Sequence, residues 1–163
     1  MATTYTHIAT TELTTTEASV AFESLGAYTD LRFYVHWATS SGSYVEIQTG
    51  SGSYTTSGYG TQVLELTGEG YKYASASALR AGFHTPISGL QGFGVFEMFQ
   101  YRNTNINKLC FGINFHNTTN GAISTSVNPT NSAIDRVRFQ CETGSGFNLI
   151  SGTKISVYGI LKA

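Results

Sequence analysis

The sequence predicts an all-β fold, an antiparallel β-sandwich of jelly-roll type. Apolar and polar residues alternate from Ile155 to Leu161 and in many other short segments, and strands of this kind bury one face and expose the other. Roughly eight to ten such segments follow one another, with turn signals about every 8 to 12 residues. No segment shows a convincing long helical pattern. Because about 150 residues is usual for one domain, we expect a single domain over residues 1–163.

The N-terminal quarter of the chain predicts three strands. Residues 3–13 are Thr-rich and are expected to form an edge strand, and residues 18–23 form a clearer second strand. Asp30 ends an expected turn over residues 28–30, where its side chain should bond locally to the backbone. The strongest alternation in the sequence follows, with these residues on one side: Leu31, Phe33, Val35 and Trp37. We expect this third strand to be central and its apolar side to anchor the core.

The middle of the chain is rich in glycine and serine. Residues 50–60 are expected to form a long exposed loop, because Gly/Ser-rich segments do not order themselves by packing. Short strands are expected on either side, over 45–47 and 62–67. Residues 71–82 fit either a short helix or an extended segment, and the surrounding strands favour the extended form. Pro86 lies in a further expected loop that ends before Phe93.

The strand expected over residues 93–101 is apolar on both faces, so two layers should cover it. Phe96 and Met98 form one of these faces and are candidate contacts with a partner. The next strand has one apolar side, made of Leu109, Phe111, Ile113 and Phe115. Further strands are expected over residues 123–127, 134–141, 147–150 and 155–161.

Composition excludes some classes of partner. Charged residues make up 12% of the chain, against about 25% in an ordinary domain, and the net charge is −1. Nine basic residues cannot create the positive field that nucleic-acid binding needs. The apolar runs are shorter than the ~20 residues of a membrane-spanning helix, and no export signal is visible. A nearly uncharged polar surface is suited to packing against other proteins.

Both cysteines, Cys110 and Cys141, lie in apolar alternating runs. Two buried thiols are the favoured interpretation, because a buried cysteine behaves as a small apolar residue. A disulfide is the alternative and would need the two Cα atoms within about 7 Å.

Few side chains could carry catalysis. The two aspartates, Asp30 and Asp135, are explained by turn bonding and by a surface ion pair with Arg136, and no pair of glutamates can be nominated for glycoside hydrolysis. The four histidines are scattered without metal-ligand spacing, and no serine-nucleophile motif occurs. We therefore expect no enzyme activity, catalytic residue, metal site or cofactor. Tyr54 and Tyr59, within the Gly/Ser-rich segment, resemble the tyrosines of adaptable binding loops and are candidate partner contacts.

Several segments, taken in order, resemble a family of β-rich virion proteins and tail-fibre modules of tailed bacteriophages and cyanophages. The most specific are Tyr-Thr-Asp-Leu at 28–31 and Val-Tyr-Gly-Ile at 157–160. The segments span nearly the whole chain and are the ranges 18–22, 28–35, 94–99, 132–139 and 146–160.

The resemblance implies a structural role at the capsid or tail surface of a virion, after synthesis in the host cytoplasm, without a cofactor. The leading hypothesis is a capsid decoration or cement protein that binds the major capsid protein, or other virion proteins, as a symmetric oligomer, with a homotrimer as the expected state. The alternative is a receptor-binding tail-fibre module that recognises a host surface glycan. A depolymerase is disfavoured because no acid pair is found.

Overall fold

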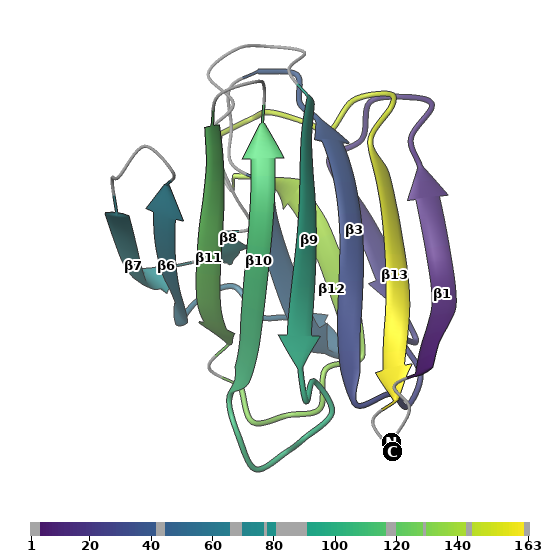
Figure 1. Cartoon of the computed structure of the whole chain (residues 1–163), viewed down its shortest axis with the longest axis vertical. Helices are drawn as coiled ribbons and strands as arrows, with labels where there is room; N and C mark the ends of the chain where they lie inside the picture. The colour runs from purple at the N-terminus through teal and green to yellow at the C-terminus, as the bar shows by residue number, and fades with distance from the viewer. Residues whose placement is uncertain are drawn as a thin grey trace.

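The computed structural model describes residues 4–41, 45–65, 70–76, 78–80, 91–116, 120–128, 130–142 and 145–161. These residues form two antiparallel β-sheets and no helix, so the predicted all-β sandwich is confirmed (Figure 1). The jelly-roll connectivity stays a prediction.

Within the described residues, the larger sheet has eight strands and the smaller has five (Figure 1). The eight-stranded sheet runs in the order β1 (Thr4–Glu12), β13 (Lys154–Leu161), β3 (Asp30–Ala38), β9 (Gln91–Phe99), β10 (Lys108–His116), β11 (Asn120–Asn128), β6 (Tyr59–Glu65) and β7 (Gly70–Ala76). The five-stranded sheet runs β2 (Ser19–Glu23), β12 (Arg136–Cys141), β4 (Val45–Ser51) and β5 (Ser53–Tyr54), with β8 (Leu79–Arg80) also paired to β4.

The core lies between the two sheets and is anchored by β3. The predicted inward side of this strand is buried, including Phe33 at 0% and Trp37 at 1% exposure. Phe33 makes an edge contact with Phe139 of β12, with ring centroids 5.3 Å apart, so aromatic packing joins the two layers. β3 lies between β13 and β9, which confirms its predicted interior position.

Several other strand predictions are confirmed. β1 is an edge strand, and β12 alternates buried and half-buried residues as predicted. Extended structure is correct for Gly70–Ala76, which pairs with β6. The rest of the ambiguous segment beyond Arg80, and the predicted loop before Phe93 up to residue 90, lie outside the described residues.

The predicted long loop over residues 50–60 is interrupted by strands, which leave residue 52 and residues 55–58 between them. The chain reverses tightly at Gly52, whose φ of +72° suits glycine, and Tyr54 pairs back with Gly50. Asp135 holds this reversal, because both of its carboxylate oxygens lie 3.2 Å from the Gly52 backbone N–H. Long-range bonding therefore orders a segment whose composition alone indicates flexibility.

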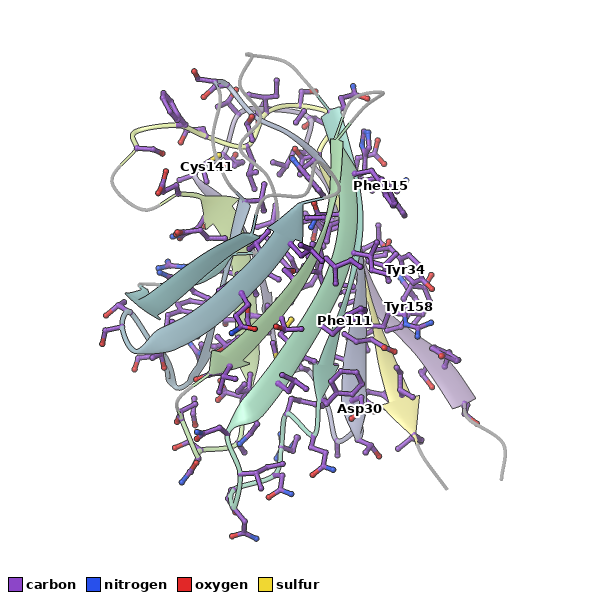
Figure 2. The ribbon with its side chains drawn as sticks, turned by 60° about the vertical axis from the view of Figure 1, so that its left-hand side comes forward. Asp30, Tyr34, Phe111, Phe115, Cys141 and Tyr158 are labelled. Atoms are coloured by element: carbon purple, nitrogen blue, oxygen red, sulfur yellow. The ribbon has the colours of Figure 1, made fainter. Side chains whose placement is uncertain are left out.

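Both cysteines are buried free thiols, as the favoured interpretation predicted. Complete burial raises the pKa of Cys110 to about 12, because a thiolate would lose its hydration there. Figure 2 shows Cys141 on the side of the five-stranded sheet.

Candidate binding surface

The outer side of the eight-stranded sheet, which faces away from the five-stranded sheet, is unexpectedly apolar. Three bulky side chains of β10 point outward and are 40–51% exposed, namely Leu109, Ile113 and Phe115. The alternate positions of β10 are buried and carry Cys110, Gly112 and Asn114. A strand with one apolar side usually turns that side to the core, and β10 does the opposite.

Phe96 explains why small residues face inward here. This side chain of β9 is 1% exposed and lies across two glycines of the sheet, Gly94 and Gly112. A Cβ atom at Gly112 would stand 2.3 Å from the Phe96 ring, and one at Gly94 would stand 2.8 Å from it. The Phe96 ring thus fills the space that side chains at Gly94 on β9 and Gly112 on β10 would otherwise occupy, so the bulky residues of β10 lie on the outside.

The inner side of β11 is polar, which strengthens the contrast. Ser126 donates a 2.9 Å hydrogen bond to the Thr61 hydroxyl of β6. The side-chain amide of Asn128 donates to the hydroxyl of Thr49, on β4 of the other sheet. A buried hydrogen-bond network therefore joins the two sheets at a place where the core is usually apolar.

Ten outward side chains form a continuous surface, which we call the outer apolar face. The strand register places Ile113 beside both Ile123 and Val95, and continues the row to Leu64 on β6 and Tyr34 on β3. The full set is Tyr34, Leu64, Phe93, Val95, Leu109, Phe111, Ile113, Phe115, Ile123 and Val127. Figure 2 shows Tyr34 and Phe115 projecting away from the five-stranded sheet.

A shallow hollow of about 310 Å³ opens in this face. Its walls are the side chains of Arg32, Tyr34, Val95, Glu97, Phe111 and Ile113. The guanidinium of Arg32 donates to Oε1 of Glu97 from Nε at 3.0 Å and from Nη2 at 2.5 Å, so the two charges neutralise each other. Partial burial alone would lower the pKa of Arg32, but hydrogen bonds to Tyr34 and Glu97 outweigh it and raise this pKa.

Aromatic rings continue from the hollow toward β1. The guanidinium carbon of Arg32 lies 5.0 Å from the centre of the Tyr5 ring, a cation–π distance. Tyr34 and Tyr158 meet edge to face with centroids 5.6 Å apart. The hollow can therefore accept an apolar side chain, or a flat polar molecule held by stacking and hydrogen bonds.

Three of the four predicted partner contacts do not reach the surface. Phe96 and Met98 belong to the core, at 1% and 0% exposure. Tyr59 is also fully buried, and its hydroxyl accepts a 3.1 Å hydrogen bond from the Thr49 backbone N–H. β9 has apolar residues on both sides, as predicted. Its outward side, however, carries Phe93 and Val95 and not the predicted contacts Phe96 and Met98.

Tyr54 alone among the four is partly exposed. It lies on β5 of the smaller sheet, with its ring 4.4 Å from the guanidinium carbon of Arg138 and 5.8 Å from that of Arg136. Burial raises the pKa of Tyr54, and the charge of Glu23 adds to the effect. Arginine stacking therefore fixes a tyrosine that we expected in an adaptable loop, and its role as a partner contact stays a prediction.

The residues considered for catalysis are held by structural bonds. Asp135 accepts a 3.0 Å hydrogen bond from Nε of Arg136, which lowers the pKa of Asp135. His36 bonds to the Gly152 carbonyl and to the Gln91 amide. In the part of the chain that the structure describes, no cluster of three or more His, Cys, Asp or Glu could hold a metal ion. No helix among the described residues is long and apolar enough to cross a membrane.

The outer apolar face was missed at the sequence level, although a signal was present. In Lys108–His116, bulky apolar residues alternate with a cysteine, a glycine and an asparagine. Such an inner row is too small and polar to fill a core unless a neighbouring strand supplies the volume. Phe96 supplies it, and only the strand pairing reveals this.

No protein-family model matches the chain, and no curated protein matches it. Among solved structures, a match is found to one described as "Structure of infectious bursal disease virus Gx strain", with 12% sequence identity and a TM-score of 0.09. The alignment covers 97% of this chain, which spans 38% of that chain. A similarity at this level carries no argument about fold or function.

Proposed function

We propose that this chain is a non-enzymatic structural protein of a phage virion, a capsid decoration or cement protein that stabilises the shell as a symmetric oligomer. The observation that carries the proposal is the outer apolar face, because an exposed apolar patch of several hundred Å² is typical of a surface that associates with another protein, a second copy included. The low charge and the resemblance to virion proteins point in the same direction. Jelly-roll connectivity and a location at the capsid surface belong to the proposal.

A cement protein works by mass action. It binds across neighbouring subunits of the assembled shell and not to the separated subunits, so its binding free energy stabilises the assembled state. An oligomer attaches at several points at once, which raises the avidity without requiring a tighter single contact. This role requires a surface that is complementary in shape to the shell and carries little charge. It requires no catalytic group.

The test is to add the purified chain to capsids of the encoding phage that lack it. We expect the chain to co-sediment with the capsids and to raise the temperature at which they rupture. Albumin at the same concentration is the control for non-specific protection. Failure to bind either procapsids or expanded capsids would refute the cement role.

The hollow favours a second candidate, a tail-fibre module that binds a host surface glycan. Tyr34 and Phe111 offer aromatic walls, and the paired Arg32 and Glu97 offer polar atoms to sugar hydroxyls. A glycan array and a host-cell adsorption assay test this function. Binding that is lost in Tyr34→Ala would favour the receptor module over the cement protein.

A further inference from the structure

We propose that the outer apolar face is the surface on which two copies of this chain meet, packed sheet against sheet around a two-fold axis. This inference rests on the proposed function in one respect only, that the protein acts as an oligomer. It names the surface, the partner and the symmetry.

The distribution of side chains across the sheet is the first argument. β10 and β11 turn bulky apolar residues toward solvent, while their inner sides carry small or polar residues such as Gly112, Asn114 and Ser126. Exposing the side chains of Phe93 and Phe115 to water costs about 25 cal/mol of free energy for each Å² of apolar surface. Burying this face against a second copy therefore stabilises the dimer relative to two separate protomers.

The size of the face fits a dimer. Five strands from β3 to β6, at ~4.8 Å spacing, span roughly 19 Å, and Leu109–Phe115 spans roughly 20 Å along β10. The product of the two spans is a flat area of about 400 Å², which leaves out the extra surface of the protruding side chains. A standard interface buries about 800 Å² on each partner, so this part of the sheet, with Glu97 and Thr125 among its apolar residues, supplies about half and the surrounding residues supply the rest.

Charge permits a second copy to bind here. None of the ten side chains of the outer apolar face is charged. Arg32 and Glu97 lie beside Phe111 in the same part of the sheet, and their charges are already paired, at 2.5 Å. Two identical faces therefore meet without like-charge repulsion, whereas a strongly charged partner would find nothing to pair with.

The order of strands also makes the face complementary to itself. β10 is central, with β9 and β3 on one side and β11 and β6 on the other. A two-fold axis parallel to β10 places β6 of one copy opposite β3 of its partner. Leu64 and Tyr34 share a register row, so Leu64, which is 54% exposed, comes opposite the hollow beside the partner copy's Tyr34. A protruding side chain thus meets a depression, and Ile113 meets its own copy on the axis.

The test is sedimentation velocity of the full chain at micromolar concentration. We expect the wild type to be a dimer and the double variant Ile113→Glu/Phe115→Glu to be a monomer, with a dissociation constant weaker by on the order of 100-fold or more. Phe147→Glu is the matched control, because Phe147 is 37% exposed but lies outside the face. This control should remain a dimer.

Circular dichroism shows whether each variant is folded, and crosslinking provides a readout that does not depend on charged substitutions. Ile113→Cys should give covalent dimers with a short bismaleimide, while Ala21→Cys, exposed on β2, should not. The native thiols are buried and should not contribute.

A wild type that stays monomeric at high concentration would overturn the inference, as would a trimer or a dimer that persists in the folded double variant. Ile113→Cys protein that fails to crosslink would overturn it as well. These results are separate from the capsid test. A dimer that does not bind capsids would refute the cement role alone, and a capsid-binding monomer would refute the two-fold face alone.

Discussion

Oδ1 of Asp30 accepts a 2.8 Å hydrogen bond from the backbone N–H of Gln100. Asp30 is the first residue of β3 and is 1% exposed, and Gln100 directly follows β9 with a φ of +48°. We expected Asp30 to bond locally to the backbone of its own turn, whereas this bond reaches a residue 70 positions away in sequence. The bond fixes where β9 ends relative to its neighbour β3.

Replacing Asp30 should show how much this hydrogen bond contributes to the free energy of unfolding. Asp30→Ala removes the charged acceptor of this partly buried hydrogen bond, and should lower the free energy of unfolding by about 1–3 kcal/mol. Asp30→Asn keeps a side-chain oxygen and should lose less. Urea denaturation at pH 7 measures both, and equal stability of the alanine variant and the wild type would show that the bond contributes nothing.

Gly92 should be intolerant of any side chain. A Cβ atom there would stand 2.3 Å from the Trp37 ring, and Trp37 is 1% exposed, so the ring cannot move aside freely. We expect Gly92→Ala to cost about 1–3 kcal/mol through overpacking. Gly60→Ala is the matched control, because its Cβ would meet nothing within 4 Å. Thermal denaturation should separate the two variants, and equal melting temperatures would contradict the close approach.

Lys108 is a buried cation that two carbonyls solvate. Its Nζ donates to the Ile106 carbonyl at 2.7 Å and to the Thr130 carbonyl at 3.4 Å, and burial lowers the pKa of Lys108. Because a buried charge is costly, Lys108→Met should be neutral or stabilising at pH 7.

The sign of the pH effect follows from the lowered pKa. Between the lowered pKa and the usual lysine pKa, the unfolded chain binds more protons than the folded one, so the unfolding free energy of the wild type rises with pH. The amount by which the unfolding free energy of Lys108→Met exceeds that of the wild type should therefore shrink between pH 7 and pH 10. Lys154→Met removes an exposed lysine paired with Glu12 and should change stability by less than about 1 kcal/mol. A loss above about 2 kcal/mol in Lys108→Met would show that the charge is needed.

Alkaline pH should destabilise the fold through Cys110. Its pKa rises from 9.0 to about 12 on folding, so this contribution to stability is complete below pH 9 and is lost as the pH rises toward 12. The expected slope is about 1.4 kcal/mol for each pH unit. Cys110→Ala should flatten the fall in unfolding free energy between pH 9 and pH 11, measured by urea denaturation. An unchanged slope would mean that the thiol ionises in the folded protein.

The core strands were predictable because their two sides differ strongly. Phe33 and Trp37 face Arg32 and His36 across one strand, so only one orientation buries the apolar side. The strand over 136–141 has arginines opposite valine and phenylalanine, and was predicted for the same reason.

The candidate surface was less predictable. Alternation shows that Phe111 and Gly112 lie on opposite sides of β10, but it does not tell which side faces the core when neither side is charged. Aromatic residues beside glycine and serine indicated binding by Tyr54 and Tyr59, yet Tyr59 is buried against Thr49 of β4. Composition within a segment cannot report bonds to a distant one.

By itself, the sequence determined the all-β architecture, the inward side of the central strand and the nearly neutral surface, because each depends on local periodicity or on composition. The tertiary structure alone decided which side of β10 meets water. That choice depends on Phe96, a residue of the neighbouring strand, whose ring occupies the interior space over Gly94 and Gly112 and leaves the bulky side of β10 outside.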